Sequence, residues 1–264
     1  MVLSEHEIRT AKLVRISSHD RASDSKSQYD FKIYTNDYFL NQIRKVIVKS
    51  ISIPNTEYNV NSKNNTLTYD IGGGDVAVTI PVGQYQNLTT LYDAVALALL
   101  NGPDAIVMTY TVNSLTNKAT LTFGVPIILR GGTSGIELID TKSTIGHVIG
   151  LSDEDTASLL VHPLPNIPDL SGLTKVYVAS KTLSVSSSMV SSNLVQANVI
   201  SEINVDVPYG YWIHRIIDDI EVTDESTSTV PINLSSIDVQ LLDQKLRPVD
   251  LQGVDVYITL CVYS

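Results

Sequence analysis

The segment 254–263, next to the C-terminus, alternates without interruption between apolar and mixed side chains. One set of alternate positions is wholly aliphatic: Val254, Val256, Ile258, Leu260 and Val262. The other set is Asp255, Tyr257, Thr259, Cys261 and Tyr263. Because successive side chains of a strand point to opposite faces, this pattern predicts a strand with one face in a core. We expect Tyr257 and Tyr263 to point outward, where a neighbouring subunit could contact them.

A second alternating segment, 237–242, is predicted to pair with 254–263 as a closing hairpin. Gly72, Gly73 and Gly74 are expected to form the turn of another hairpin, between the strands 67–71 and 76–80. The further predicted strands are 29–34, 43–53, 67–71, 76–80, 106–112, 118–123, 175–179, 199–207 and 212–222.

Helical periodicity is confined to two segments, 88–100 and 141–150. Thr90 and Asp93 are expected to form a variant capping box at the start of the first. Three prolines, Pro163, Pro165 and Pro168, are expected to exclude regular strand pairing from the loop after residue 157.

About ten strands with no strand–helix alternation predict an all-β fold. The specific expectation is an antiparallel single jelly-roll sandwich with one or two short helices in loops. Residues 1–28 are polar and mixed in charge, so they are predicted to form an N-terminal arm outside the core. Residues 29–264 are then expected to form one jelly-roll domain.

The formal net charge of −10 argues against nucleic-acid binding, because an acidic surface repels phosphate. With one cysteine, the chain can form no intramolecular disulfide, which fits folding in a reducing compartment. The first residues lack the pattern of a signal peptide, and no apolar run reaches about 18 residues, so secretion and membrane spanning are not expected.

A search for reactive groups predicts no catalytic residue, cofactor or metal site. The five histidines are not paired at the spacing of metal ligands, and no Gly-x-Ser-x-Gly turn occurs. Cys261 is expected to be a small packing residue. Two acidic groups, 153–155 and 218–225, are predicted to be solvated turns. Calcium binding is the alternative.

An ordered set of short segments runs along nearly the whole chain: 15–21 with 27–31, 53–61 with 64–67, 80–85, 145–151, 176–180, 207–210 and 241–253. In this order they resemble the penton, or vertex, proteins of virophages, polinton-like viruses and related large double-stranded DNA viruses. Leu151 stands where that pattern has an aromatic residue, and a glycine expected near Lys245 is missing.

The resemblance implies a structural virion protein and not an enzyme, made in the host cytosol. Five copies would close each icosahedral vertex. Their neighbours in the shell would be double-jelly-roll major capsid proteins and minor capsid proteins. A vertex spike or a host receptor would be a further partner. The subunit-interface candidates are Arg15, Asp20, Arg21, Tyr257 and Tyr263. Alternatives are a minor capsid or cement protein, a receptor- or glycan-binding appendage module, and a jelly-roll enzyme.

Overall fold

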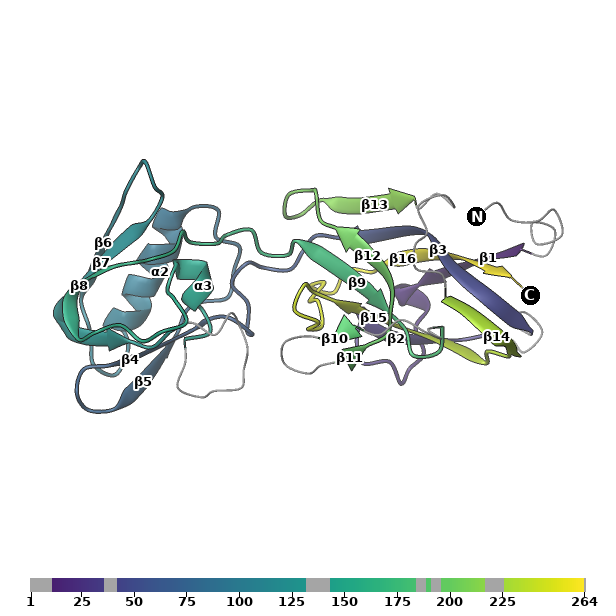
Figure 1. The fold of residues 1–264 in the computed structure, drawn as a ribbon, viewed down its shortest axis with the longest axis horizontal. Helices are drawn as coiled ribbons and strands as arrows, with labels where there is room; N and C mark the ends of the chain where they lie inside the picture. Colours follow the sequence, from purple (N-terminus) through teal and green to yellow (C-terminus); the bar gives the residue numbers. More distant parts are fainter. Residues whose placement is uncertain are drawn as a thin grey trace. The chain divides into compact units, whose positions relative to one another are not determined.

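The computed structural model describes residues 11–35, 42–131, 143–183, 189–190, 196–216 and 226–263. Within this part of the chain the contacts divide into two units (Figure 1). Unit 1 comprises Met1–Glu57 and Leu173–Ser264, and unit 2 comprises Tyr58–Gly172. In sequence, unit 2 is therefore an insertion within unit 1.

The first sheet of unit 1, called sheet A here, joins strands from both ends of the chain. Its order is β1 (Ala11–Ser17), β16 (Tyr257–Tyr263), β3 (Ile43–Pro54) and β13 (Trp212–Ile216). A fifth strand, β14 (Ser226–Ile232), pairs with the beginning of β3. All pairings are antiparallel.

The second sheet, sheet B, has the order β12 (Val199–Asn204), β9 (Lys175–Ala179), β15 (Ser236–Leu242) and β2 (Asp30–Tyr34). Its pairings are also antiparallel. A short ladder of β10 (Met189–Val190) and β11 (Gln196–Ala197) follows β9 in the chain.

The connectivity of these two sheets is that of a jelly roll. With β14 and the short ladder set aside, the described part of unit 1 has eight strands in chain order. Sheet A holds the first, eighth, third and sixth, and sheet B holds the fifth, fourth, seventh and second. Neighbouring strands are thus mostly distant in sequence, as in two interlocked Greek keys. The predicted all-β antiparallel jelly roll is confirmed.

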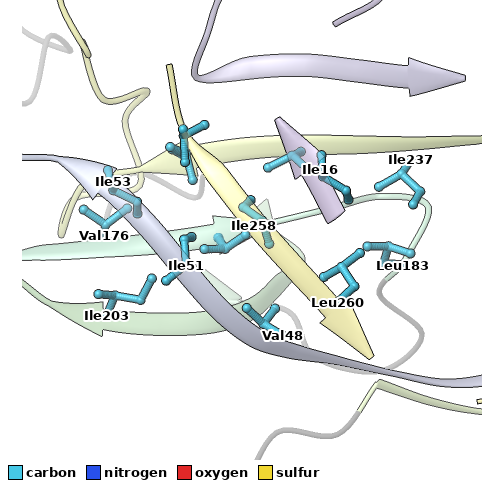
Figure 2. Packing of buried hydrophobic residues seen from close by; sticks show 14 of the residues in the cluster. Ile16, Val48, Ile51, Ile53, Val176, Leu183, Ile203, Ile237, Ile258 and Leu260 are labelled. Atoms are coloured by element: carbon cyan, nitrogen blue, oxygen red, sulfur yellow. The ribbon is translucent and has the colours of Figure 1, made fainter. Parts of the chain in front are cut away.

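The inner faces of the two sheets share one core (Figure 2). Ile51, Ile258 and Leu260 from sheet A pack in the same cluster as Val176 and Ile203 from sheet B. These side chains alternate with outward-facing ones along each strand, which is the pattern that a sandwich core requires. The alternation at 254–263 therefore did mark a core strand, although the strand begins at Tyr257.

Unit 2 has its own sheet, with the order β5 (Asp75–Thr79), β4 (Thr66–Asp70), β7 (Ala119–Leu129) and β6 (Met108–Val112). Another strand, β8 (Leu159–Pro163), also pairs with β7. The hairpin β4–β5 turns at Gly72 and Gly74, whose φ angles of 100° and 104° lie in the region that glycine favours.

The described part of unit 2 also contains two helices, α2 (Leu88–Leu100) and α3 (Gly146–Ile149) (Figure 1). The buried face of α2 is Leu91, Tyr92, Val95 and Leu99, and it packs in one cluster with the sheet. Asn87 caps this helix by accepting the Thr90 N–H at 2.9 Å, so the predicted Thr90–Asp93 capping box is wrong. The short helix has Gly150 as its C-cap, as predicted, but residues 143–145 of the predicted helix 141–150 are not helical.

Four other expectations need correction. The strands β15 and β16 lie in different sheets, so they form no closing hairpin. Residues 11–17 are an edge strand of sheet A and not part of an external arm. Residues 29–264 contribute to two units and not to one domain. Pro163 ends β8, which pairs with β7 where no strand was predicted, because proline is tolerated on an edge strand.

Candidate functional site

The outer face of sheet A carries a group of exposed aromatic rings, called the aromatic strip here: Trp212, His214 and Tyr257. The rings of Trp212 and His214 stack with centroids 6.0 Å apart and planes at 9°. The rings of Trp212 and Tyr257 are tilted at 33°, with centroids 6.1 Å apart. Residues from two strands that are not sequence neighbours thus form one surface.

Strand register brings these rings together. Ser52 of β3 lies opposite both Tyr257 of β16 and His214 of β13. The Ser52 hydroxyl lies 2.9 Å from the Nδ1 atom of His214, which fixes the imidazole against the sheet. Because Ile213 is fully buried in the core, alternation places Trp212 and His214 on the opposite, outer face.

The aromatic strip is accessible to solvent: Trp212 is 37% exposed and Tyr257 is 52% exposed. The next row of the same face contains Arg15, Thr259, Ser50 and Ile216. Ile216 is 77% exposed, which is unusual for an isoleucine on a regular strand. Exposed aromatic and aliphatic groups next to an arginine are the composition that is enriched in protein interfaces.

The predicted interface residues fall at different places. Arg15 and Tyr257 are exposed on this outer face, and Asp20 is exposed in the 3-10 helix η1 (Ser18–Asp20). Arg21 is half-buried and makes contacts within the chain, donating to the Ser18 carbonyl oxygen at 2.9 Å. Its guanidinium also lies 3.7 Å from the Asp255 carboxylate.

Tyr263 is not available to a neighbouring subunit as predicted. Its side chain is only 7% exposed and packs with Ile47 and Cys261 in a small cluster. The Lys45 ammonium lies 5.5 Å from the centroid of the Tyr263 ring, a cation–π geometry. Tyr263 is therefore a packing residue, and Cys261 is buried, as predicted.

A polar network fastens η1 to the strand that completes the sheet. The Ser18 hydroxyl donates to the Asp255 carboxylate at 2.8 Å and accepts the Val256 N–H at 3.0 Å. His19 approaches the second oxygen of the same carboxylate at 3.4 Å. This network explains why 15–21, expected to be an arm, is held in the fold.

The acidic group 153–155 forms internal contacts. Asp155 pairs with Arg130 at 3.0 Å, and Asp153 lies 3.2 Å from the imidazole of His147. Arg130 also pairs with Asp70 and Asp75. Hydrogen bonds from the N–H groups of the glycine turn, together with Arg130, hold the pKa of Asp70 below its usual value.

Among the described residues, no group of three or more His, Cys, Asp or Glu side chains is arranged to hold a metal ion. The acidic group 218–225 lies outside the described residues. In that same part of the chain, none of the helices has the length and hydropathy needed to cross a membrane. The expectations of no enzyme activity and no cofactor stay predictions.

Sequence reasoning placed a strand at Trp212 but did not identify Trp212 and His214 as surface residues. The usable signal was the sequence Trp212-Ile213-His214, in which two aromatic rings flank a core isoleucine at alternate positions. What the sequence did not reveal is that β16 would bring Tyr257 beside them.

Comparisons with known proteins find solved structures that are similar and a family model that matches. The crystal structure of a selenomethionine-labelled mavirus penton protein is similar, with a TM-score of 0.49 and 10% identity, covering 96% of this chain and 99% of the other. A search of curated proteins finds no match. A family model described as "Family of unknown function (DUF5901)" matches residues 13–252. Because this match spans most of the sequence, the chain belongs to the family DUF5901.

Proposed function

We propose that the protein is a structural capsid component of the penton type. Five copies assemble head to tail into a ring that closes an icosahedral vertex. In such a ring one face of each subunit contacts a different face of the next, and the rotation closes on itself. The protein acts through its shape and its contact area, without a reactive group.

The observation that carries the proposal is the jelly-roll strand order of unit 1 combined with the exposed aromatic strip on its outer sheet. Eight-stranded jelly rolls are common in viral capsid and lectin domains. Within those two classes, a face with Trp212, Tyr257 and Ile216 exposed beside Arg15 favours contact with another protein. The ordered penton-like segments of the sequence give independent support.

The proposal includes partners and a location. The pentamer sits in the virion between double-jelly-roll major capsid proteins, and minor capsid proteins or a vertex spike contact its rim. The acidic balance of −10 suits contacts with protein and disfavours contacts with packaged nucleic acid.

Native mass spectrometry of the purified full chain tests the proposal. We expect a five-chain species, and we expect Trp212→Glu to reduce it at least tenfold, because the charge would be desolvated within the interface. The control is Leu115→Glu, a substitution at a fully exposed residue in unit 2, which should leave the pentamer intact.

Circular dichroism on both variants verifies that the fold is retained. A wild-type chain that stays monomeric at micromolar concentration, both alone and mixed with its major capsid protein, would overturn the penton proposal.

A glycan-binding role is the second candidate, because the stacked rings of Trp212 and His214 offer a flat apolar surface to a sugar ring. A glycan array with the wild-type chain and Trp212→Glu distinguishes it. Binding to defined glycans by a monomer, lost in the variant, would favour this candidate over the penton.

A further inference from the structure

Unit 2 contains a groove between the strand β5 and the C-terminal half of the helix α2. It has a volume of about 380 Å³. The strand contributes Ala77, Val78 and Thr79, and the helix contributes Ala94, Leu97 and Ala98. None of the side chains that line the groove is charged. The groove lies entirely within unit 2 and far in sequence from the aromatic strip.

One wall of the groove is the edge of a sheet. Among the described residues, β5 pairs with β4 only. The Ile80 N–H donates to the Asn65 carbonyl oxygen on the β4 side at 2.8 Å. Because the backbone groups of a strand alternate in direction, those of Ala77 and Thr79 point away from β4, along the open edge. They are positioned to pair with an added strand.

The other wall is shaped for small or medium side chains. Ala94 and Ala98 leave room along the helix, and Leu97 is 55% exposed beside them. At the end of the groove Gly102 approaches the strand so closely that a Cβ would lie 2.8 Å from the Val78 side chain. A side chain at residue 102 would therefore require the backbone or the Val78 side chain to shift.

The edge of β5 lacks the features that usually block strand addition. Natural edge strands carry lysine, proline or bulges that prevent pairing with other chains. The β5 sequence, Asp-Val-Ala-Val-Thr, has no such residue in its interior, and its ladder with β4 has no bulge. Pro81 comes only after the strand has ended.

Carboxylates lie near the first residue of β5. Asp75, Asp70 and Asp155 all pair with Arg130, so three carboxylates gather around one guanidinium. The side chains that line the groove include no cation. The start of β5, next to the groove, therefore favours a positive charge on a segment that pairs along the strand.

We propose that the groove binds an extended segment of another protein. The segment adds as a strand to β5 through the outward backbone groups of Ala77 and Thr79. Alternate small or medium apolar side chains enter the groove beside Leu97, and a lysine or arginine lies next to Asp75. Backbone pairing supplies affinity and the groove supplies side-chain selectivity, as in other cases of strand addition. This binding does not depend on the proposed penton role.

The test is a selection of random peptides, displayed on phage, against the full-length chain with counter-selection on Ala77→Pro. Proline at residue 77 removes the outward N–H, which takes no part in the ladder with β4. Circular dichroism on this variant verifies that the fold is retained. We expect enriched peptides with alternating apolar residues and a terminal Lys or Arg. Their synthetic versions should bind Ala77→Pro at least tenfold more weakly than wild type.

Two leucines of α2 provide a matched pair of further variants. Leu97→Glu should reduce the affinity for the selected peptides at least tenfold. Leu100 is also exposed but lies outside the groove, so Leu100→Glu should bind the peptides with wild-type affinity. If no peptide distinguishes wild type from Ala77→Pro, the proposal is wrong. Concentration-dependent dimerisation that Ala77→Pro abolishes would also overturn it, because the occupant would then be a second copy.

Discussion

The jelly roll of unit 1 combines strands from opposite ends of the chain, whereas unit 2 consists of one continuous stretch. In unit 1 the first and last described strands, β1 and β16, are hydrogen-bonded neighbours. In unit 2 the hairpins β4–β5 and β6–β7 are local in sequence. The two buried clusters share no residue. The same chain thus contains one core set by long-range pairing and one set mainly by local pairing.

The largest expected effect tests whether the two cores unfold separately. Ile51→Asp places a carboxylate in the core of unit 1, where it would have no partner. It should lower the free energy of unfolding of unit 1 by more than about 4 kcal/mol. Hydrogen exchange should then show unprotected amides in unit 1 and retained protection in unit 2. Leu121→Asp should give the reverse pattern.

The control for both is Ile216→Asp, at a residue exposed on the outer face of sheet A, which should keep protection in both units. Loss of protection in both units from either core variant would contradict the division into two cores.

A smaller loss of stability in unit 1 is expected when the side chain of Asp238 is removed. Its carboxylate accepts the N–H groups of Lys181 and Thr182 at 2.9 and 2.8 Å, and so holds the turn that inserts Leu183 into the core. Asp238→Ala should lower the free energy of unfolding of unit 1 by about 2–3 kcal/mol. Asp24→Ala, at an exposed carboxylate, should change it by less than about 1 kcal/mol, as measured by urea denaturation.

The same carboxylate gives an acid dependence with a defined sign. Burial would raise the pKa of Asp238, but the hydrogen bonds from the turn outweigh burial and hold the pKa below its usual value. The stability it contributes is therefore present above the unfolded pKa of about 4 and is lost as pH falls through the folded pKa. Asp238→Ala should flatten the stability profile of unit 1 below pH 4.

Tyrosines make unit 2 sensitive to alkali. Burial, with the nearby Asp104 carboxylate that accepts its hydroxyl, raises the pKa of Tyr69 to about 12. Burial also raises the pKa values of Tyr85, Tyr92 and Tyr110, which all belong to unit 2. Since an unfolded tyrosine ionises near pH 10, stability is complete below that value and is lost as pH rises towards 12.

Thermal unfolding of unit 2 between pH 9 and 12 measures this loss. Tyr69→Phe should reduce the pH dependence by on the order of 1 kcal/mol, although it removes a hydrogen bond at neutral pH. An unchanged slope in the variant would exclude Tyr69 as a source of the alkaline sensitivity.

The smallest expected effect concerns the start of α2. Asn87→Ala removes the side-chain acceptor for the Thr90 N–H and should destabilise unit 2 by about 1 kcal/mol. Thr89→Ala, at an exposed position in the first turn, is the control and should change stability by less than about 0.5 kcal/mol. Equal effects of the two substitutions would argue against Asn87 as the cap.

Local patterns predicted most of the strands and the helix α2, but they missed β1, β8 and β14 and made the second helix too long. Long-range pairing explains the errors in strand partners. The glycine turn at Gly72 fixed its hairpin because turn and register are set within a few residues. The partner of β16 was not predictable in this way, since alternation identifies faces but not neighbours. The turn through Leu246, with a φ of 59°, carries the chain between sheets and not back along the same one.

The candidate site was predictable only in part, because alternation gives the face of a residue but not its neighbours on other strands. Tyr257 was placed outward from alternation, and its exposure confirms that. Tyr263 shares the same face, yet Ile47 from β3 and Cys261 pack against it, and this contact depends on sheet order. Trp212 joins Tyr257 only through the intervening strand β3, which no local pattern specifies.

The pairing of β1 with β16 also has a consequence for synthesis on the ribosome. The sheet that contains the aromatic strip cannot be completed until β16 has left the exit tunnel, because this strand lies between β1 and β3. Unit 2 is finished long before, and its hairpins can form while translation continues. The nascent chain therefore carries β1 and β3 without the strand between them, and chaperones have their longest opportunity to bind during that interval.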